Sequence, residues 1–156
     1  MQEEAKLRKD FHRAIQAKLF NSGICSADGI IEDFKRTFLW NEMGVETSRA
    51  LNLEQLQQAF KKLSEFPLTN IVNTLMFKFS KYPSPSSILR CTEGQIKKIR
   101  AIAIYRMKLT EDRLFEYVAE SCERRTYKLN ITKTEADHLI KRLEAWETNQ
   151  VRKGKL

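Results

Sequence analysis

The sequence is poor in glycine, proline and cysteine. Its 156 residues include five Gly, three Pro and three Cys. So few turn-forming residues argue against an all-β fold, which needs many tight turns. The odd number of widely spaced cysteines, Cys25, Cys91 and Cys122, favours reduced thiols over a disulfide framework or a zinc site.

Long apolar segments are also missing. The first ten residues, MQEEAKLRKD, are mostly polar, so no signal peptide is expected. The most apolar stretch, Ile71 to Phe79, is interrupted by Asn73, Thr74 and Lys78. It falls well short of the roughly 20 apolar residues that span a bilayer. We therefore expect a soluble, cytoplasmic protein with no membrane partner.

Signatures of catalysis are absent as well. The two histidines, His12 and His138, lie in different halves and belong to no metal-ligand pair. No phosphate-binding glycine loop, dinucleotide fingerprint or nucleophile elbow occurs. We expect no enzymatic activity, no cofactor and no metal site.

The sequence does contain helical periodicity. In the first half, apolar residues recur at three- and four-residue steps over about 3–20, 28–44 and 53–66. Asn52 and Gln55 have the spacing of a capping box, and Gly44 suits a left-handed C-terminal cap. Pro67 should end the third helix, because proline disfavours helix in the residue before it.

The second half shows the same features. Thr92 with Gln95, and Thr132 with Glu135, have capping-box spacing, and Thr110 can cap the helix between them. The last helix carries the clearest apolar stripe, formed by Ala136, Leu139, Ile140, Leu143 and Trp146. Residues 68–82 fit either a helix or a short strand, and we favour a helix. PSPSS at 83–87 indicates an extended linker.

These patterns predict an all-α protein of two three-helix units. The units span 1–67 and 92–150, with a connector at 68–91 and a basic tail at 151–156. An offset of 80 residues pairs Asn52 with Thr132 and Phe38 with Val118, which indicates an internal duplication. The alternative is that any two amphipathic three-helix units look alike.

Charge is unevenly distributed. Residues 1–66 hold ten Lys/Arg and ten Asp/Glu, whereas residues 67–156 hold eighteen and ten, so the whole net charge of +8 lies in the second part. A basic half joined to a neutral half is typical of a protein in which one part contacts a polyanion such as DNA. The alternative is a protein that merely has a high pI.

Nine basic residues are the candidates for nucleic-acid contact. On the helix predicted from residue 92, basic side chains and Tyr105 project opposite the apolar stripe, although a solvated helix face would give the same pattern. Three more cations precede the last helix, and two lie on its outer side. The candidates are Lys97, Lys98, Arg100, Lys108, Arg124, Arg125, Lys128, Lys141 and Arg142.

Four segments resemble the GemA-type regulatory proteins of Mu-like bacteriophages. They are FHRAIQAKL (Phe11–Leu19), GVETSRALNLEQLQQAFKKL (Gly44–Leu63), TEGQIKKIRAIAIYR (Thr92–Arg106) and ITKTEADHLIKRLEAW (Ile131–Trp146). The chain departs from the family pattern by a longer Asn21–Asp28 loop and by Phe34 in place of a tyrosine. The resemblance implies a phage or prophage context and a regulatory, non-enzymatic role in DNA transactions. It carries over no individual binding residues.

Two functions follow from these observations. The first is a phage-derived regulator whose basic second half contacts DNA or a DNA-bound complex. The second is an adaptor that binds a host or phage protein through a helical groove, suggested by the aromatic residues Phe38, Trp40 and Phe66 of the neutral half.

Overall fold

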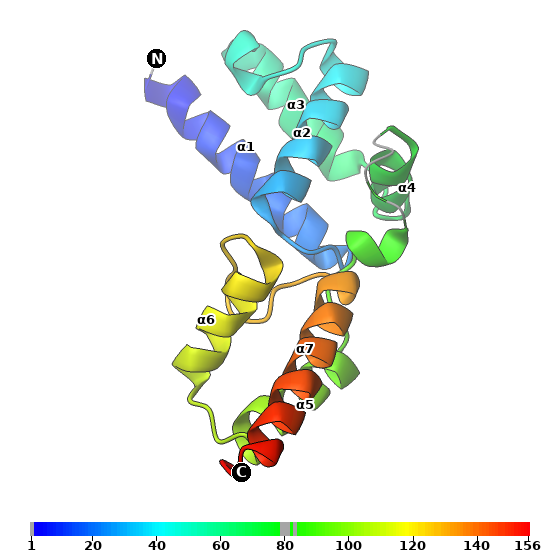
Figure 1. Cartoon of the computed structure of the whole chain (residues 1–156). Helices are drawn as coiled ribbons and strands as arrows, with labels where there is room; N and C mark the ends of the chain where they lie inside the picture. Colours follow the sequence, from blue (N-terminus) through cyan, green and yellow to red (C-terminus); the bar gives the residue numbers. More distant parts are fainter. Residues whose placement is uncertain (1, 79–81, 83) are drawn as a thin grey trace. The chain divides into compact units, whose positions relative to one another are not determined.

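The structure is a computed structural model that describes residues 2–78, 82 and 84–156 (Figure 1). The described residues form helices and no strand, so the all-α prediction is confirmed; Arg90 and Thr132 form an isolated antiparallel bridge. The chain divides into two compact units, Met1–Ile88 (unit 1) and Leu89–Leu156 (unit 2).

The described residues of unit 1 form four helices. They are α1 (Gln2–Asn21), α2 (Asp28–Met43), α3 (Leu53–Glu65) and α4 (Thr69–Lys78), with short 3-10 turns η1 (Ser48–Ala50) and η2 (Pro85–Ser87). The helix favoured for 68–82 is thus present up to Lys78; Phe79 and Pro83, which entered the helix and linker predictions, lie outside the described residues. Because α4 packs on α2, it is part of unit 1, whereas the sequence suggested a connector there.

Aromatic side chains form much of the core of unit 1. Phe11 of α1 lies 5.4 Å from Phe60 and 6.3 Å from Phe38, measured between ring centroids. Phe66, just after α3, packs against Phe34 and Phe38 of α2 at 6.0 and 5.6 Å. Offset and edge-on pairs of this kind stabilise a core beyond the area they bury.

The predicted helix ends of unit 1 are confirmed. Asn52 Oδ1 accepts a hydrogen bond from the Gln55 N–H at 2.9 Å, and Gln55 Oε1 accepts one from the Asn52 N–H at 3.0 Å. Gly44 caps α2 with φ of 70°. This left-handed conformation favours glycine, which has no Cβ to clash.

A buried carboxylate ties the chain after α4 back to α2. Asp33 of α2 is buried and accepts a hydrogen bond from the Tyr82 hydroxyl. Burial, with the adjoining carboxylate, raises the pKa of Tyr82 above its ordinary range. Tyr82 therefore stays a hydrogen-bond donor at any physiological pH.

Unit 2 contains three helices, as predicted for the second half. They are α5 (Glu93–Arg100), continued by the π-helical segment η3 (Ala101–Arg106), then α6 (Glu111–Cys122) and α7 (Lys133–Arg152). Their core is aliphatic and consists mainly of Ile99, Ile102, Ala103, Leu114, Val118, Ile131, Ala136, Leu139 and Leu143.

Helices α5 and α7 run in the same direction. Near their starts, the Gln95 side-chain amide donates to the Lys133 carbonyl at 3.0 Å. Near their ends, Arg106 Nε lies 3.0 Å from a carboxylate oxygen of Glu147. At the end of η3 the Met107 N–H donates to the carbonyl five residues back, at 2.9 Å. Ile102 and Ala103 are both buried here, three and four residues after the buried Ile99.

The burial pattern agrees with the alignment of the two halves. Phe38 and Val118 are both buried, as are Leu56 and Ala136, and Asn52 and Thr132 both form capping boxes. Packing of one amphipathic helix on another would give the same agreement. An origin by duplication therefore stays a prediction.

Candidate nucleic-acid interface

Helix α7 is held in one rotation about its axis, which fixes the residues that face outward. Its capping box is confirmed: Thr132 Oγ1 accepts from the Glu135 N–H at 3.1 Å, and Glu135 Oε1 accepts from the Thr132 N–H at 2.9 Å. Its apolar stripe, Ala136, Leu139, Ile140 and Leu143, is buried. A helix pinned at its start and along one face can display the opposite face without rotating.

The outward face of α7 carries basic and neutral residues. With 100° of rotation per residue, these outward-facing residues span an arc of about 120° around the helix axis, and the helix is roughly 30 Å long. All are exposed, and none is acidic: His138, Lys141, Arg142, Ala145, Thr148, Asn149 and Arg152. We call this set the α7 stripe.

Each acidic side chain of α7 has a partner elsewhere in unit 2. Glu135 pairs with Arg124 at 2.6 Å, Glu144 with Lys98 at 3.3 Å, and Glu147 with Arg106 at 3.0 Å. Asp137 accepts a hydrogen bond from the Gln95 side-chain amide at 2.8 Å. These contacts hold the carboxylates beside α5 and the loop before α7, and leave the α7 stripe free of negative charge.

Three of the nine predicted residues are therefore engaged with carboxylates. Lys98 and Arg124 bind acids of α7, and Arg100 binds Glu111 at 2.7 Å. Their positive charge is compensated within the protein. They hold the three helices together, and this weakens their case as phosphate contacts.

The other six predicted residues are exposed and have no carboxylate within ion-pairing distance among the described residues. Lys141 and Arg142 belong to the α7 stripe, and the Arg142 guanidinium also lies 5.7 Å from the Tyr117 ring centroid. The remaining four lie elsewhere in unit 2: Lys97 on α5, Lys108 beyond η3, and Arg125 and Lys128 in the loop before α7.

The predicted ridge on the fourth helix is broken up. The helix ends at Arg106, and Lys108 adopts a left-handed conformation with φ of 59° in the following turn. Lys98 turns toward Glu144 on α7. Lys97 and the 70% exposed Tyr105 remain on the helical segment.

The polar part of the stripe was not predicted from the sequence. Thr148 and Asn149 were not singled out, and Arg152 was assigned to a basic tail, whereas α7 continues through it. Helical spacing could have indicated them, because Thr148, Asn149 and Arg152 follow Ala145 at three, four and seven residues. Tyr127 was also missed; it is 72% exposed, and the Lys128 ammonium lies 5.4 Å from its ring centroid.

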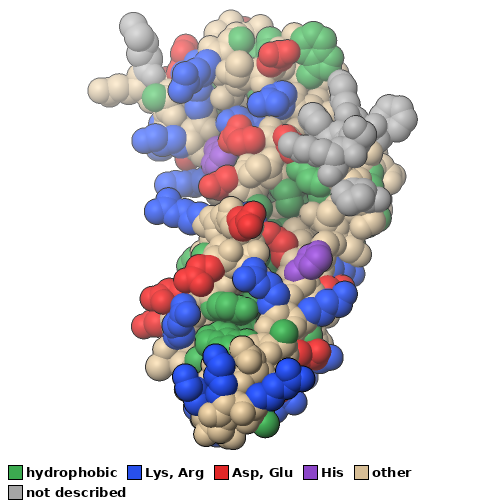
Figure 2. All heavy atoms as spheres, in the orientation of Figure 1, with side chains coloured by type: hydrophobic (Ala, Val, Ile, Leu, Met, Phe, Trp, Pro, Cys, Tyr) green, Lys and Arg blue, Asp and Glu red, His purple; other side chains and the backbone are tan. Residues whose placement is uncertain are grey.

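The hollow between α5 and α7 has mixed charge. It has a volume of about 490 Å³ and brings Lys98 and Lys141 together with Asp137 and Glu144. Because cations and carboxylates balance there, the hollow does not favour an anion. Figure 2 likewise shows basic and acidic side chains interspersed on the visible face of unit 2.

Comparisons with protein families, curated proteins and solved structures find no match to this chain. Among the described residues, no helix is long and apolar enough to cross a membrane. The same part of the chain has no cluster of His, Cys, Asp and Glu able to hold a metal ion.

Proposed function

We propose that the protein is a non-enzymatic DNA-binding regulator in which the α7 stripe lies against the phosphate backbone. The observation that carries this proposal is the separation of charge on α7. All its acids are engaged with partners in unit 2, while Lys141, Arg142 and Arg152 face outward. A surface that keeps carboxylates away from one helix face suits contact with a polyanion.

Each part of the stripe has a role in this mode of binding. Lys141, Arg142 and Arg152 would neutralise phosphates, and the Asn149 amide would donate hydrogen bonds to phosphate oxygens, whereas the Thr148 hydroxyl donates to the Glu144 carbonyl at 2.9 Å. Ala145 lies among these residues, and its small side chain would let α7 approach the DNA backbone closely. Such contacts position a protein on the duplex without reading bases, so affinity should depend strongly on salt and weakly on sequence.

The regulatory part of the proposal rests on the resemblance to GemA-type phage proteins. A phage or prophage regulator that contacts DNA, or a complex assembled on DNA, would combine the α7 stripe with a separate role for unit 1. An adaptor role for unit 1 has less support, since Phe38 and Phe66 pack in the core. Trp40, 51% exposed, is the remaining aromatic of that hypothesis.

Fluorescence anisotropy with a labelled duplex over a salt series tests the proposal. The triple variant Lys141→Ala/Arg142→Ala/Arg152→Ala should bind more weakly, and its slope of log K against log salt should fall by about 1 for each phosphate-binding cation that is removed. The control, Lys6→Ala/Lys9→Ala/Lys61→Ala, removes three exposed cations from unit 1. Equal effects of the two variants, or no binding at low salt, would rule the α7 interface out.

A further inference from the structure

Unit 1, which looked neutral in sequence, contains a polar pocket lined by three cations. The pocket has a volume of about 640 Å³ and lies between α2 and the segment around η1. Glu32, Lys35 and Arg36 come from α2, and the other lining residues, Glu46, Thr47, Ser48 and Arg49, come from consecutive positions of that segment. Pockets of this size accommodate small organic ligands.

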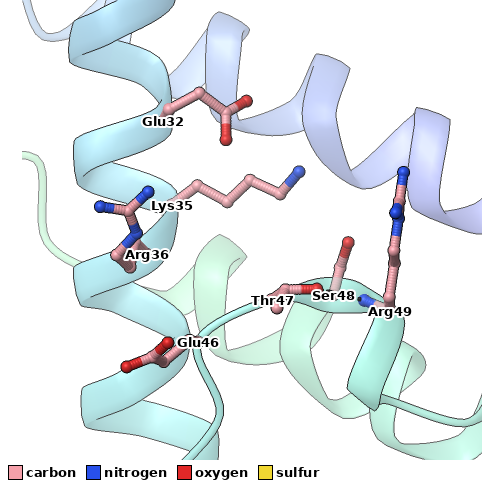
Figure 3. A pocket seen from close by; sticks show the side chains of 7 residues that line it. All are labelled: Glu32, Lys35, Arg36, Glu46, Thr47, Ser48 and Arg49. Atoms are coloured by element: carbon pink, nitrogen blue, oxygen red, sulfur yellow. Dashed lines mark hydrogen bonds between the residues drawn. The ribbon is translucent and has the colours of Figure 1, made fainter.

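Three side chains point into the same part of the pocket. Figure 3 shows the Lys35 ammonium, the Ser48 hydroxyl and the Arg49 guanidinium around one space, with the Glu32 carboxylate on the neighbouring turn of α2. No carboxylate among the described residues lies within ion-pairing distance of Lys35 or Arg49. Glu32 itself lies 3.9 Å from Nδ1 of His12. Two positive charges therefore share one space without a direct ion pair, and the three cations of the lining outnumber its two carboxylates, Glu32 and Glu46.

Ser48 points to a ligand independently of charge. It is 6% exposed, yet its hydroxyl has no hydrogen-bond partner among the described residues, and it opens into the pocket (Figure 3). The hydroxyl is not one of the atoms that are buried without a partner, so it is a donor that the pocket leaves accessible to a ligand. An anion in the pocket would accept its hydrogen bond.

The segment that carries Ser48 is fixed in place. Arg8 of α1 donates from Nε to the Ser48 carbonyl at 3.1 Å and from an Nη to the Leu51 carbonyl at 3.0 Å. Thr47 Oγ1 accepts from the Arg49 N–H at 2.9 Å, and Leu51 is buried. The donors are thus arranged before any ligand arrives, which reduces the entropic cost of binding.

We infer that this pocket binds the phosphate group of a small phosphorylated molecule. An ammonium, a hydroxyl and a guanidinium are all hydrogen-bond donors, and a tetrahedral oxyanion offers acceptors in several directions. The guanidinium can grip two phosphate oxygens at once, and Arg36 at the rim adds a further positive charge. The site lies wholly in unit 1 and does not rest on DNA contact by α7.

Titration of the full-length protein with inorganic phosphate and with pyrophosphate, followed by amide NMR, tests this inference. Saturable shifts are expected at Lys35 and at Thr47 to Arg49. Lys35→Ala/Arg49→Ala should weaken pyrophosphate binding by about tenfold or more, since the substitutions remove both charged donors. Ser48→Ala keeps the charge and should weaken it several-fold.

The control is Lys9→Ala/Lys61→Ala, which removes the same charge from exposed positions of unit 1 outside the pocket. It should leave pyrophosphate affinity within about twofold of the wild type, because screened distant charges contribute little. An equal loss of affinity in the control, or the absence of saturable shifts with either anion, would overturn the inference. Shifts at Ser48 produced by a DNA duplex and not by pyrophosphate would overturn it too.

Discussion

Arg124 and Glu135 are joined by two hydrogen bonds, of 2.8 and 2.6 Å, that close the loop between α6 and α7. The same carboxylate accepts the Thr132 N–H as part of the capping box. Glu135 therefore fixes the start of α7 and the end of the preceding loop together. Together with the buried apolar residues of α7, this side chain sets the orientation of the α7 stripe.

Removing the guanidinium of Arg124 should destabilise unit 2. Arg124→Ala leaves Glu135 partly buried with one strong partner fewer, so the free energy of unfolding should fall by about 1–3 kcal/mol. Urea denaturation followed by circular dichroism measures the change. Arg125→Ala, at the exposed neighbouring position, should shift it by less than about 0.5 kcal/mol. Similar decreases in both variants would contradict the structural role of Arg124.

The same pair predicts how stability depends on pH. Burial alone would raise the pKa of Glu135, but the hydrogen bonds from Arg124 and the Thr132 N–H outweigh it and hold the pKa below the ordinary 4.5. A carboxyl with a lowered folded pKa contributes stability above its unfolded pKa and loses it as pH falls through the folded value. The stability difference between wild type and Glu135→Gln should therefore shrink below about pH 4.5.

Denaturant titrations at a series of pH values would show this convergence. The double variant Arg124→Ala/Glu135→Gln should follow the pH profile of Glu135→Gln. A difference between wild type and Glu135→Gln that stays constant down to strongly acidic pH would exclude a lowered pKa at this site.

Arg8 should matter to unit 1 beyond its charge. Arg8→Ala removes both bonds that hold the Ser48 and Leu51 carbonyls, so the free energy of unfolding should fall by about 1–2 kcal/mol. Pyrophosphate affinity should fall as well, because Ser48 and Arg49 are no longer held beside Lys35. Lys9→Ala is the matched control, and normal pyrophosphate binding by Arg8→Ala would show that α1 does not position the pocket.

An acidic residue placed in the α7 stripe should act on binding alone. Ala145 is exposed, so Ala145→Glu should leave the unfolding transition in place while lowering duplex affinity by about tenfold at low salt. Gln58→Glu adds the same charge to the exposed side of α3 and should have a small effect. The idea fails if both variants bind the duplex like the wild type.

The three cysteines should differ in reactivity. Cys25 and Cys91 are buried, whereas Cys122 is partly exposed, and burial also raises the pKa of the Cys91 thiol. A thiol reagent should therefore modify Cys122 first in the native protein and reach the other two after unfolding. Mass spectrometry of partially labelled protein gives the order, and early modification of Cys91 would contradict the packing of unit 2.

Local sequence signals predicted the fold well. The caps at Asn52, Thr92 and Thr132 and the left-handed Gly44 involve residues three or four apart, where helix geometry alone sets the contacts. The π-helical segment η3 was not predicted. One extra residue in a turn does not change which residue types form the apolar face of the helix, so the sequence carries no signal for it.

Contacts between residues distant in the sequence explain most of the differences between the predicted and the observed candidate site. Lys98 lies far along the chain from Glu144, so a helix projection showed it as free, and Arg124 lies in a loop, where no helical spacing indicates its contact with Glu135. The pocket of unit 1 was overlooked for a related reason. The balanced charge of residues 1–66 hid the convergence of Lys35 and Arg49, which only the fold brings together.

The parallel course of α5 and α7 has one more consequence. Peptide dipoles add along each helix, so the carboxyl ends of both helices place partial negative charge at the same end of unit 2. Arg106, Lys108, Arg152 and Lys153 follow or close these two ends. The cations at the end of α7 therefore offset the partial negative charge of their own helix end. High salt should weaken this stabilisation of the helix end, and it should weaken any contact with DNA as well.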